Sequence, residues 1–308
     1  MKPVILPLII IITVTFLSSA ANAAQFNQDK NLSSDNLLIN ISSGWLTGQA
    51  KEYVYGENNS KLSELDWEIK STPIIKGDIS WNTTPWLTLE ANGWITLKPS
   101  HSTMHDFDWT IPNQTHWSDL SYSPNTRLNY ANEFNINSNI WLMKKNNFKL
   151  AGVIGYQQTQ FDWTAIGGYY DYNNGQEKGE FPPIPGIAYK QKLSVPYIGG
   201  KIQYKYKNWE FNTLLKYSPW VLAMDNDEHY LRQLNFIEKT HSSKYYSARA
   251  NIGYYITPQM KFFSEWIWNR YTLGRGRTTV NGISLNCSSC AGIENRNYQI
   301  VFGIAYQF

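Results

Sequence analysis

The last eleven residues of the chain alternate strictly between two kinds of side chain. Large apolar or aromatic residues occupy every second position from Tyr298 to Phe308, and smaller or polar residues such as Gln299 and Gly303 lie between them. A period of two places the large groups on one face of an extended strand, and this length is enough for a tilted strand to cross a membrane. The pattern predicts a membrane-crossing β-strand, because the last edge strand of a soluble sandwich rarely alternates for so long.

Earlier in the chain, further alternating stretches are joined by short polar segments, which predict hairpin turns. The alternating stretches lie at 148–156, 198–206 and 246–254, and the short turns at 82–85, 144–147, 207–208 and 257–260. Between the hairpins lie long polar connections at 47–65, 99–132, 162–193, 223–244 and 272–296. Connections this long are uncommon in compact soluble domains but are usual on one rim of an outer-membrane barrel.

Four short turns and five long connections require ten strands, an even number that is typical of closed membrane barrels. We therefore predict an all-β fold, a ten-stranded antiparallel transmembrane β-barrel with long extracellular loops. Both ends of the barrel chain then fall on the short-turn side, so the five long connections emerge together on the outer rim.

The N-terminal segment predicts export. Met1-Lys2 is followed by an apolar run from Val4 to Leu17 and by the small residues of Ala21-Asn22-Ala23, as in a secretory signal peptide. We expect residues 1–23 to be a signal peptide and 24–308 to be one outer-membrane barrel domain. No run of 18 apolar residues follows residue 24, so a closed barrel is the remaining way into a membrane. The predicted location is the bacterial outer membrane.

Composition agrees with this class of protein. Only 17% of the residues are charged, 15% are aromatic, and the net charge of +3 gives no footprint for nucleic-acid binding. Disorder is excluded, because a chain so rich in rings can bury ample apolar surface. We expect aromatic girdles at the membrane interfaces, to which we assign Trp45, Trp94, Trp141, Trp163, Trp220 and Tyr271.

Two short acidic segments are the candidates for chemistry. Asp106 and Asp108 lie in the second long connection, and Asp227 and His229 lie in the fourth. Each pair is spaced i, i+2, so its two side chains face the same way on extended backbone. Brought together across the barrel mouth, the Asp–His couple can take a proton from water while the carboxylate pair holds that water. Solvated loop acids with an unrelated histidine remain the alternative from spacing alone.

A metal site is a second alternative for the same segment. His101 and His105 with Asp106 and Asp108 offer nitrogen and oxygen ligands of the kind that zinc binds, but no His-Glu-x-x-His motif is present. All five histidines fall in the second and fourth long connections, and we expect none of them in a strand. A pore is a further option, although ten strands leave little open lumen.

The two acidic segments carry a family resemblance. Asp106-Phe107-Asp108-Trp109 and the run from Asp225 to Tyr230, in a barrel with five long connections, resemble the omptin family of outer-membrane endopeptidases. The resemblance implies an aspartic-type protease in which Asp227 and His229 activate water and Asp106 and Asp108 complete the site. It also implies cleavage next to basic residues, with Glu52, Asp119 and Asp225 as the acidic groups that bind the substrate's Lys or Arg.

The resemblance further implies that lipopolysaccharide is an activator, with no other cofactor and no metal. The matching lipid-binding positions are Tyr156, Gln158 and Gln160, with Lys192 in place of a further arginine. Two of these positions lack the charge that the family uses, so Lys190, Lys239 and His241 are possible substitutes. The expected partners are polypeptides with basic residues, lipopolysaccharide and the outer membrane.

Two questions stay open at this point. A non-enzymatic adhesin or invasin that binds host proteins through its loops is the alternative function. Cys287 and Cys290 lie three residues apart in the fifth connection, where a local disulfide and half of a zinc site are both possible readings.

Overall fold

The computed structural model describes residues 36–56 and 58–308, which form one sheet. The predicted signal peptide, residues 1–23, lies outside the described residues. The strands are β1 (Leu37–Tyr55), β2 (Lys61–Thr84), β3 (Leu87–Thr96), β4 (Ser100–Asp108), β5 (Asp119–Lys145), β6 (Phe148–Tyr172), β7 (Glu177–Tyr206), β8 (Trp209–His229), β9 (Leu234–Tyr255), β10 (Met260–Val280), β11 (Ile283–Ser284) and β12 (Ala291–Gln307).

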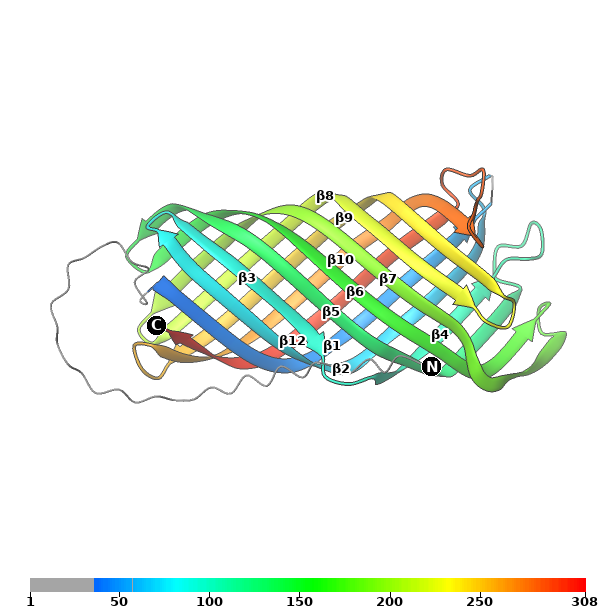
Figure 1. Ribbon diagram of the computed structural model, residues 1–308, viewed down its shortest axis with the longest axis horizontal. Helices are drawn as coiled ribbons and strands as arrows, with labels where there is room; N and C mark the ends of the chain where they lie inside the picture. The colour runs from blue at the N-terminus through cyan, green and yellow to red at the C-terminus, as the bar shows by residue number, and fades with distance from the viewer. Residues whose placement is uncertain (1–35, 57) are drawn as a thin grey trace, which may run out of the picture. The chain divides into compact units, whose positions relative to one another are not determined.

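The sheet closes into a ring of ten strands, as predicted. Each strand is antiparallel to its neighbours, and β1 pairs with both β2 and β12, which joins the two ends of the sheet. The segments β3 and β4 together occupy one strand position of the ring, because each of them pairs with β2 on one side and with β5 on the other. The two-residue β11 pairs with β10. Figure 1 shows the strands crossing the barrel obliquely, the tilt that closure of a sheet requires.

All four predicted hairpin turns are confirmed, and they lie at the same end of the barrel as the C-terminus (Figure 1). Three of them are two-residue turns, and two of these begin with Asn146 and Lys207, whose φ angles are 46° and 52°. Such left-handed backbone is favoured in two-residue hairpin turns, because it matches the twist of the flanking strands.

The five long connections are present at the opposite rim, but they consist mostly of strand rather than loop. The described segments outside the long strands at this rim are 56, 58–60, 109–118, 173–176, 230–233 and 281–290, the last of which contains β11, and residues 97–99 separate β3 from β4. Polar residues there led us to expect loops, yet they continue the backbone ladder beyond the apolar band. The expectation that no histidine lies in a strand was therefore wrong, since among the five only His116 falls between strands.

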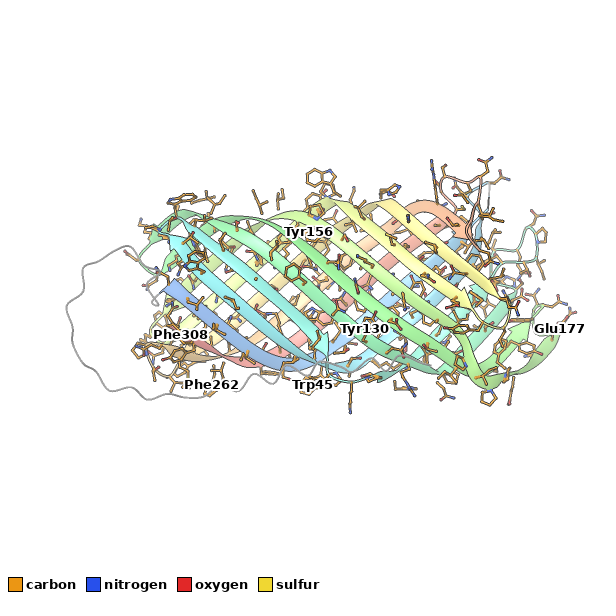
Figure 2. All side chains as sticks on the ribbon, viewed as in Figure 1. Trp45, Tyr130, Tyr156, Glu177, Phe262 and Phe308 are labelled. Atoms are coloured by element: carbon orange, nitrogen blue, oxygen red, sulfur yellow. The ribbon has the colours of Figure 1, made fainter. Side chains whose placement is uncertain are left out.

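Large apolar side chains point outward in a band around the short-turn half of the barrel. On β12, Ile300, Phe302, Ile304 and Tyr306 are exposed, while the residues between them face inward or are partly buried, as the alternation predicted. Figure 2 shows Trp45, Tyr130, Tyr156 and Phe262 on the walls of the barrel and Phe308 at the short-turn end. None of the described residues forms a helix long and apolar enough to cross a membrane.

Only some of the residues that we assigned to the aromatic girdles lie on the outer surface of the barrel. Trp45 and Trp220 project outward, with exposures of 50% and 61%, and Trp141 is half-buried. The side chains of Trp94, Trp163 and Tyr271 are instead buried inside the barrel. Proximity to a strand end did not reveal the direction of a side chain, which depends on the register of each strand.

Buried rings occupy the lumen below the outer rim, in a cluster that we call the aromatic plug. Its ring centroids lie 5.1 to 6.5 Å apart, and the two most tightly stacked rings, Trp67 and Tyr189, are inclined by only 7°. Such offset stacks stabilise a core beyond the burial of their area. The members of the plug are Trp67, Trp94, Phe161, Trp163 and Tyr189.

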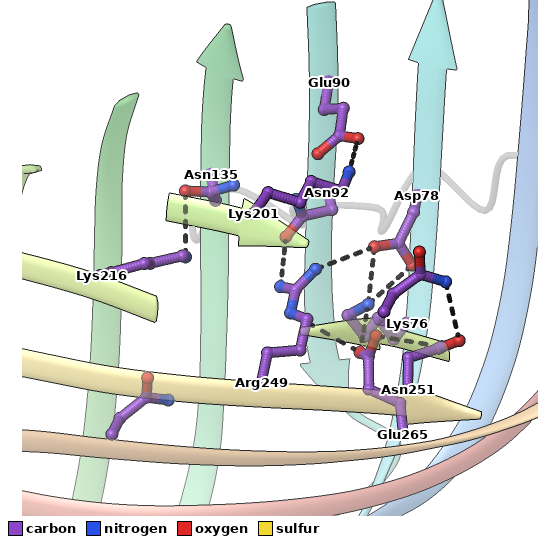
Figure 3. A network of polar contacts seen from close by, with 12 residues as sticks. Lys76, Asp78, Glu90, Asn92, Asn135, Lys201, Lys216, Arg249, Asn251 and Glu265 are labelled. Atoms are coloured by element: carbon purple, nitrogen blue, oxygen red, sulfur yellow. Dashed lines mark hydrogen bonds and ion pairs between the residues drawn. The ribbon is translucent and has the colours of Figure 1, made fainter. Parts of the chain in front are cut away.

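Nearer the short turns, the lumen is crossed by a network of charged groups (Figure 3). The buried Lys76 ammonium lies 2.6 Å from Asp78 and 3.0 Å from Glu265, and Arg249 lies within 4 Å of the same two carboxylates. The side-chain amide of Asn251 donates to Glu265 over 3.3 Å. Each buried charge in this network therefore has an opposite charge beside it, which offsets the cost of removing it from water.

The cysteine pair does not form the local disulfide that was one of its two interpretations. Cys287 and Cys290 are free thiols, and the Cys290 thiol donates to the backbone carbonyl of Cys287 over 3.7 Å. The structure therefore contains no disulfide between these residues. Their segment is held instead by Arg275, which donates to the Ser289 carbonyl and stacks 3.3 Å above the Tyr55 ring.

The charged network predicts a large stability effect for a single substitution. Lys76→Met should lower the free energy of unfolding by about 3 kcal/mol, because Asp78 and Glu265 lose their closest cation. The control is Lys70→Met, whose pair with Glu68 is exposed and should contribute less than about 1 kcal/mol. Denaturant unfolding of the refolded barrel in detergent measures both, and equal small losses would contradict the prediction.

Candidate active site

Strands β4 and β8 carry the four predicted catalytic residues on opposite walls of the barrel. The two strands are separated by β5, β6 and β7 around the ring of ten. Asp106 and Asp108 end β4, and Asp227 and His229 end β8, so both pairs lie at the rim opposite the short turns. The i, i+2 spacing turns each pair toward the lumen, because alternate residues of a strand share a face.

Asp227 and His229 form a tight hydrogen-bonded couple. His229 Nε2 lies 2.6 Å from Asp227 Oδ2, and the imidazole packs edge-on against the Phe236 ring of β9. Burial disfavours the charged imidazolium, but the hydrogen bond and the charge of Asp227 outweigh it and raise the pKa of His229. The couple therefore favours the protonated form of His229 more than an isolated imidazole would.

Asp106 and Asp108 face this couple from β4. Burial and the neighbouring Asp108 raise the pKa of Asp106 to about 7, while the charge of His229 opposes that rise. Burial also raises the pKa of Asp108, against the hydrogen bond from Ser63. The charge of Asp108 therefore opposes ionisation of Asp106.

Two neighbours of the carboxylate pair were missed in the sequence. The Ser63 hydroxyl donates to Asp106 Oδ1 over 3.2 Å, and Ser63 pairs with Asp108 in the β2–β4 register. Arg232, in the turn between β8 and β9, acts electrostatically on Asp106, Asp108 and His229. Neither has a sequence signal of its own, since one is a strand serine and the other an exposed turn residue.

A second acidic group lies beside the couple, and we call its three members the acidic pocket: Glu52, Asp225 and Glu238. One carboxylate oxygen of each lies within 4.8 Å of the others, and all three side chains are buried. Burial, with repulsion from neighbouring carboxylates, raises the pKa of each well above its ordinary value. Glu52 and Asp225 were predicted as substrate-binding residues, whereas Glu238 was not singled out.

The aromatic plug forms the support under this pocket. The Tyr189 hydroxyl donates to Asp225 Oδ2 over 3.1 Å and accepts a hydrogen bond from the Gln191 amide. Tyr189 also stacks on Trp67, so its hydroxyl is held in place. This contact fixes one oxygen of Asp225 and leaves Oδ1 without a partner.

Asp119 does not join the acidic pocket. It pairs with Asp108 across β4 and β5, which places it three strands, or about 14 Å, from β1 and Glu52. Its oxygens accept hydrogen bonds from Ser118, Thr110 and the Asn173 backbone. These contacts connect the β4–β5 loop to the β6–β7 hairpin, a structural role that the sequence did not indicate.

The alternative metal set does not converge. The His105 ring is stacked between Tyr122 and Phe107, and burial lowers its pKa. His105 and Asp106 are consecutive residues of a strand, so their side chains point to opposite faces. His101 is exposed, away from the buried Asp106.

The predicted lipid-binding residues lie on the outer wall. Tyr156 of β6 and Lys192 of β7 are both exposed, and Gln160 is the register partner of Lys192. Lys192, Met224, Lys239 and Arg277 continue this register row across β7, β8, β9 and β10. Lys190 differs from them, because it pairs with Asp162 at 3.3 Å.

The raised pKa of Asp106 predicts how stability depends on pH. Ionising Asp106 disfavours the folded state, so its contribution to stability is lost as pH rises from about 4 to about 7. Asp106→Asn should therefore be more stable than the parent at pH 8, by roughly 2–4 kcal/mol, and similar to it at pH 4. Chemical unfolding at both pH values checks this against exposed Glu180→Gln, and equal stability at pH 8 would contradict it.

Comparison with known proteins identifies the family. Residues 33–308 match the Omptin family. The chain is 44% identical to the plasminogen activator of Yersinia pestis over 96% of its length and 97% of the relative. It is 39% identical to the outer membrane protease OmpP of Escherichia coli, with both chains covered completely.

A solved structure gives the same result. The outer membrane protease OmpT from Escherichia coli superposes with a TM-score of 0.86 at 39% identity. The match covers 91% of this chain and 99% of OmpT. Fold, sequence and the named relatives agree, and the chain belongs to the omptin family of outer-membrane proteases.

Proposed function

We propose that this outer-membrane protease cleaves polypeptides next to Lys or Arg, with a water activated by Asp227 and His229 opposite Asp106 and Asp108. The observation that carries the proposal is the 2.6 Å Asp227–His229 couple, which faces a carboxylate pair and adjoins the acidic pocket. A general base, a group that holds the nucleophilic water and a subsite for the substrate are then assembled at one rim.

The couple supplies the general base. With Nε2–H donating to Asp227, His229 has its Nδ1 lone pair available to accept a proton from water. Asp227 stabilises the imidazolium that forms, and its charge is the reason that the pKa of His229 is raised. The water then attacks the scissile carbonyl, and the imidazolium returns the proton to the leaving amine.

The carboxylate pair holds the attacking water. Because Asp106 has a pKa of about 7, the pair retains one proton near neutral pH, which lets it both donate and accept hydrogen bonds. Arg232 acts electrostatically on both carboxylates and so supports their remaining negative charge. The substrate carbonyl would lie between the β4 and β8 walls.

The preference for basic residues comes from Glu52 and Asp225. Both carboxylates are buried, and each has an oxygen without a hydrogen-bond partner. Among the described residues, neither forms an ion pair with a lysine or arginine. A cation beside buried carboxyl groups favours their ionised form, and a Lys or Arg side chain of the substrate would supply it.

Loss of the couple should abolish turnover without unfolding the barrel. His229→Ala and Asp227→Ala should each lower kcat by about 100-fold or more, because general-base catalysis contributes this much. Peptide hydrolysis measures the loss, with exposed Glu228→Gln on the same strand as the control. Intact activity in either variant would exclude the mechanism, and complete inhibition by a chelator would favour a metal.

Lipopolysaccharide is the proposed activator, bound on the outer wall near Tyr156. Lys192, Lys239 and Arg277 lie there in one register row and are exposed, spaced by about 10 Å or less along the wall. Such a row of cations suits the phosphate groups of a lipid headgroup. It would replace the charges absent at Gln158 and Gln160.

A cleavage profile of the refolded protein tests the specificity and the activator together. Peptides with Arg-Arg or Lys-Lys should be cleaved, and the same peptides with neutral residues at those positions should resist, because the acidic subsite lacks a cation. Lipopolysaccharide should increase the rate. Failure to cleave any peptide, together with binding of host proteins, would instead support the adhesin alternative.

A further inference from the structure

We propose that Glu238 is a third carboxylate of the substrate pocket, which contacts the cationic side chain of the substrate together with Glu52 and Asp225. This inference rests on the proposed preference for basic residues and names a further residue that determines it. Nothing in the β9 sequence distinguishes Glu238 from an ordinary strand acid. Its assignment comes from the position of its carboxylate.

Strand register brings Glu238 to the pocket. Glu238 of β9 is the direct partner of Asp225 on β8, and Thr278 of β10 is its partner on the other side. Glu52 reaches the same point from β1, so that carboxylate oxygens of the three acids lie within 4.8 Å of one another. The side chain of Glu238 is completely buried, which excludes a role as a solvated surface acid.

One oxygen of the Glu238 carboxylate accepts a hydrogen bond, and the other oxygen has no hydrogen-bond partner. Thr278 Oγ1 donates to Glu238 Oε1 over 2.8 Å, which fixes the direction of the side chain. Oε2 is buried without a partner, as are Glu52 Oε2 and Asp225 Oδ1. Three unsatisfied acceptors from three different strands are costly in a resting protein, and a single multivalent donor would satisfy them.

The charge balance points to a cation as that donor. No lysine or arginine of residues 36–56 and 58–308 forms an ion pair with any of the three acids. Lysines inside the barrel do pair with several of its other buried acids, for example Lys76 with Asp78 and Lys261 with Glu210. The pocket is therefore a place where the protein leaves buried carboxyl groups without a cation of its own, and a cationic partner would favour their ionised form.

Binding of such a cation is coupled to protons. Burial and mutual repulsion raise the pKa of each pocket acid, and Glu238 is one of the groups that raise the pKa of Glu52. A basic side chain binds most strongly to the ionised form of these acids, so its binding should strengthen as pH rises through their raised pKa values. The titratable groups that face Glu238 from the surrounding strands are Glu52 of β1, Tyr189 of β7, and Asp225 and Asp227 of β8.

The test compares peptides that differ only in the residue at the cut, either Arg, Lys or the uncharged norleucine. Glu238→Gln should lower kcat/KM for the Arg and Lys peptides by about 10-fold or more, because a charge-assisted contact is lost. The norleucine peptide should be little affected. Exposed Glu177→Gln, at the tip of the β6–β7 hairpin (Figure 2), is the matched control and should leave all three values unchanged.

A pH profile separates contact with the substrate from a purely structural role. In Glu238→Gln, the rise of kcat/KM with pH for basic peptides should move to lower pH, because Glu52 loses a repelling neighbour. The profile for the norleucine peptide, which reports the catalytic groups alone, should not move. A structural defect would shift neither profile selectively.

The outcomes distinguish this inference from the proposed function. A parent enzyme that cleaves the norleucine peptide as well as the basic ones would overturn the proposed specificity itself. A parent that prefers basic residues, with the same preference within twofold in Glu238→Gln, would overturn only the role of Glu238. If Glu238→Gln does not refold, Glu238→Asp gives the same readout, because the shorter side chain withdraws its carboxylate from the pocket.

Discussion

The structure depends first on the pairing of every backbone ladder with a neighbour on both sides. A strand in hydrocarbon has no water to satisfy an open edge, so the sheet must close. The pairing of β1 with β12 provides that closure, and it continues from Leu38 to Val54, well beyond the apolar band. Because the ladder persists outside the lipid, the candidate catalytic groups lie on rigid strand rather than on mobile loops.

Acidic side chains inside the barrel fall into two groups, one paired with lysine and arginine and one without such partners. Toward the short turns, the buried acids Asp78 and Glu265 share Lys76 and Arg249, and the network is internally neutralised. Toward the outer rim, Glu52, Asp225 and Glu238 have no cation among the described residues. The buried rings of the aromatic plug lie between the two groups. Acids that are paired with cations and acids that are not thus lie at different levels of the same lumen.

Much of the architecture could be predicted because it follows from local pattern. Alternation in the last strand and the short polar turns were sufficient for the count of ten strands. The i, i+2 spacing at Asp106–Asp108 and Asp227–His229 indicated that each pair shares a face. These features need only neighbouring residues, and a period of two is preserved wherever the strand is regular.

The remaining features depend on register, which no local pattern reports. Whether Trp163 faces lipid or lumen, and whether Glu238 meets Asp225, depends on pairing between distant strands. Asp119 lies apart from the acidic pocket for the same reason, since its neighbours come from β4 and from the Asn173 turn. Polar composition was also misleading, because strands outside the membrane keep their ladder without needing an apolar face.

The β1–β12 seam has a consequence for how the chain reaches this state. Its two strands are separated by more than two hundred residues, so the contact that closes the ring is the most remote in sequence. Formation of such contacts must await ordering of the intervening hairpins, which makes folding slow. Until β12 arrives, β1 and β10 both present unpaired edges. Pairing of the final strand therefore completes the assembly of the barrel. A chain in which β12 has not yet paired is the form most exposed to mispairing and proteolysis.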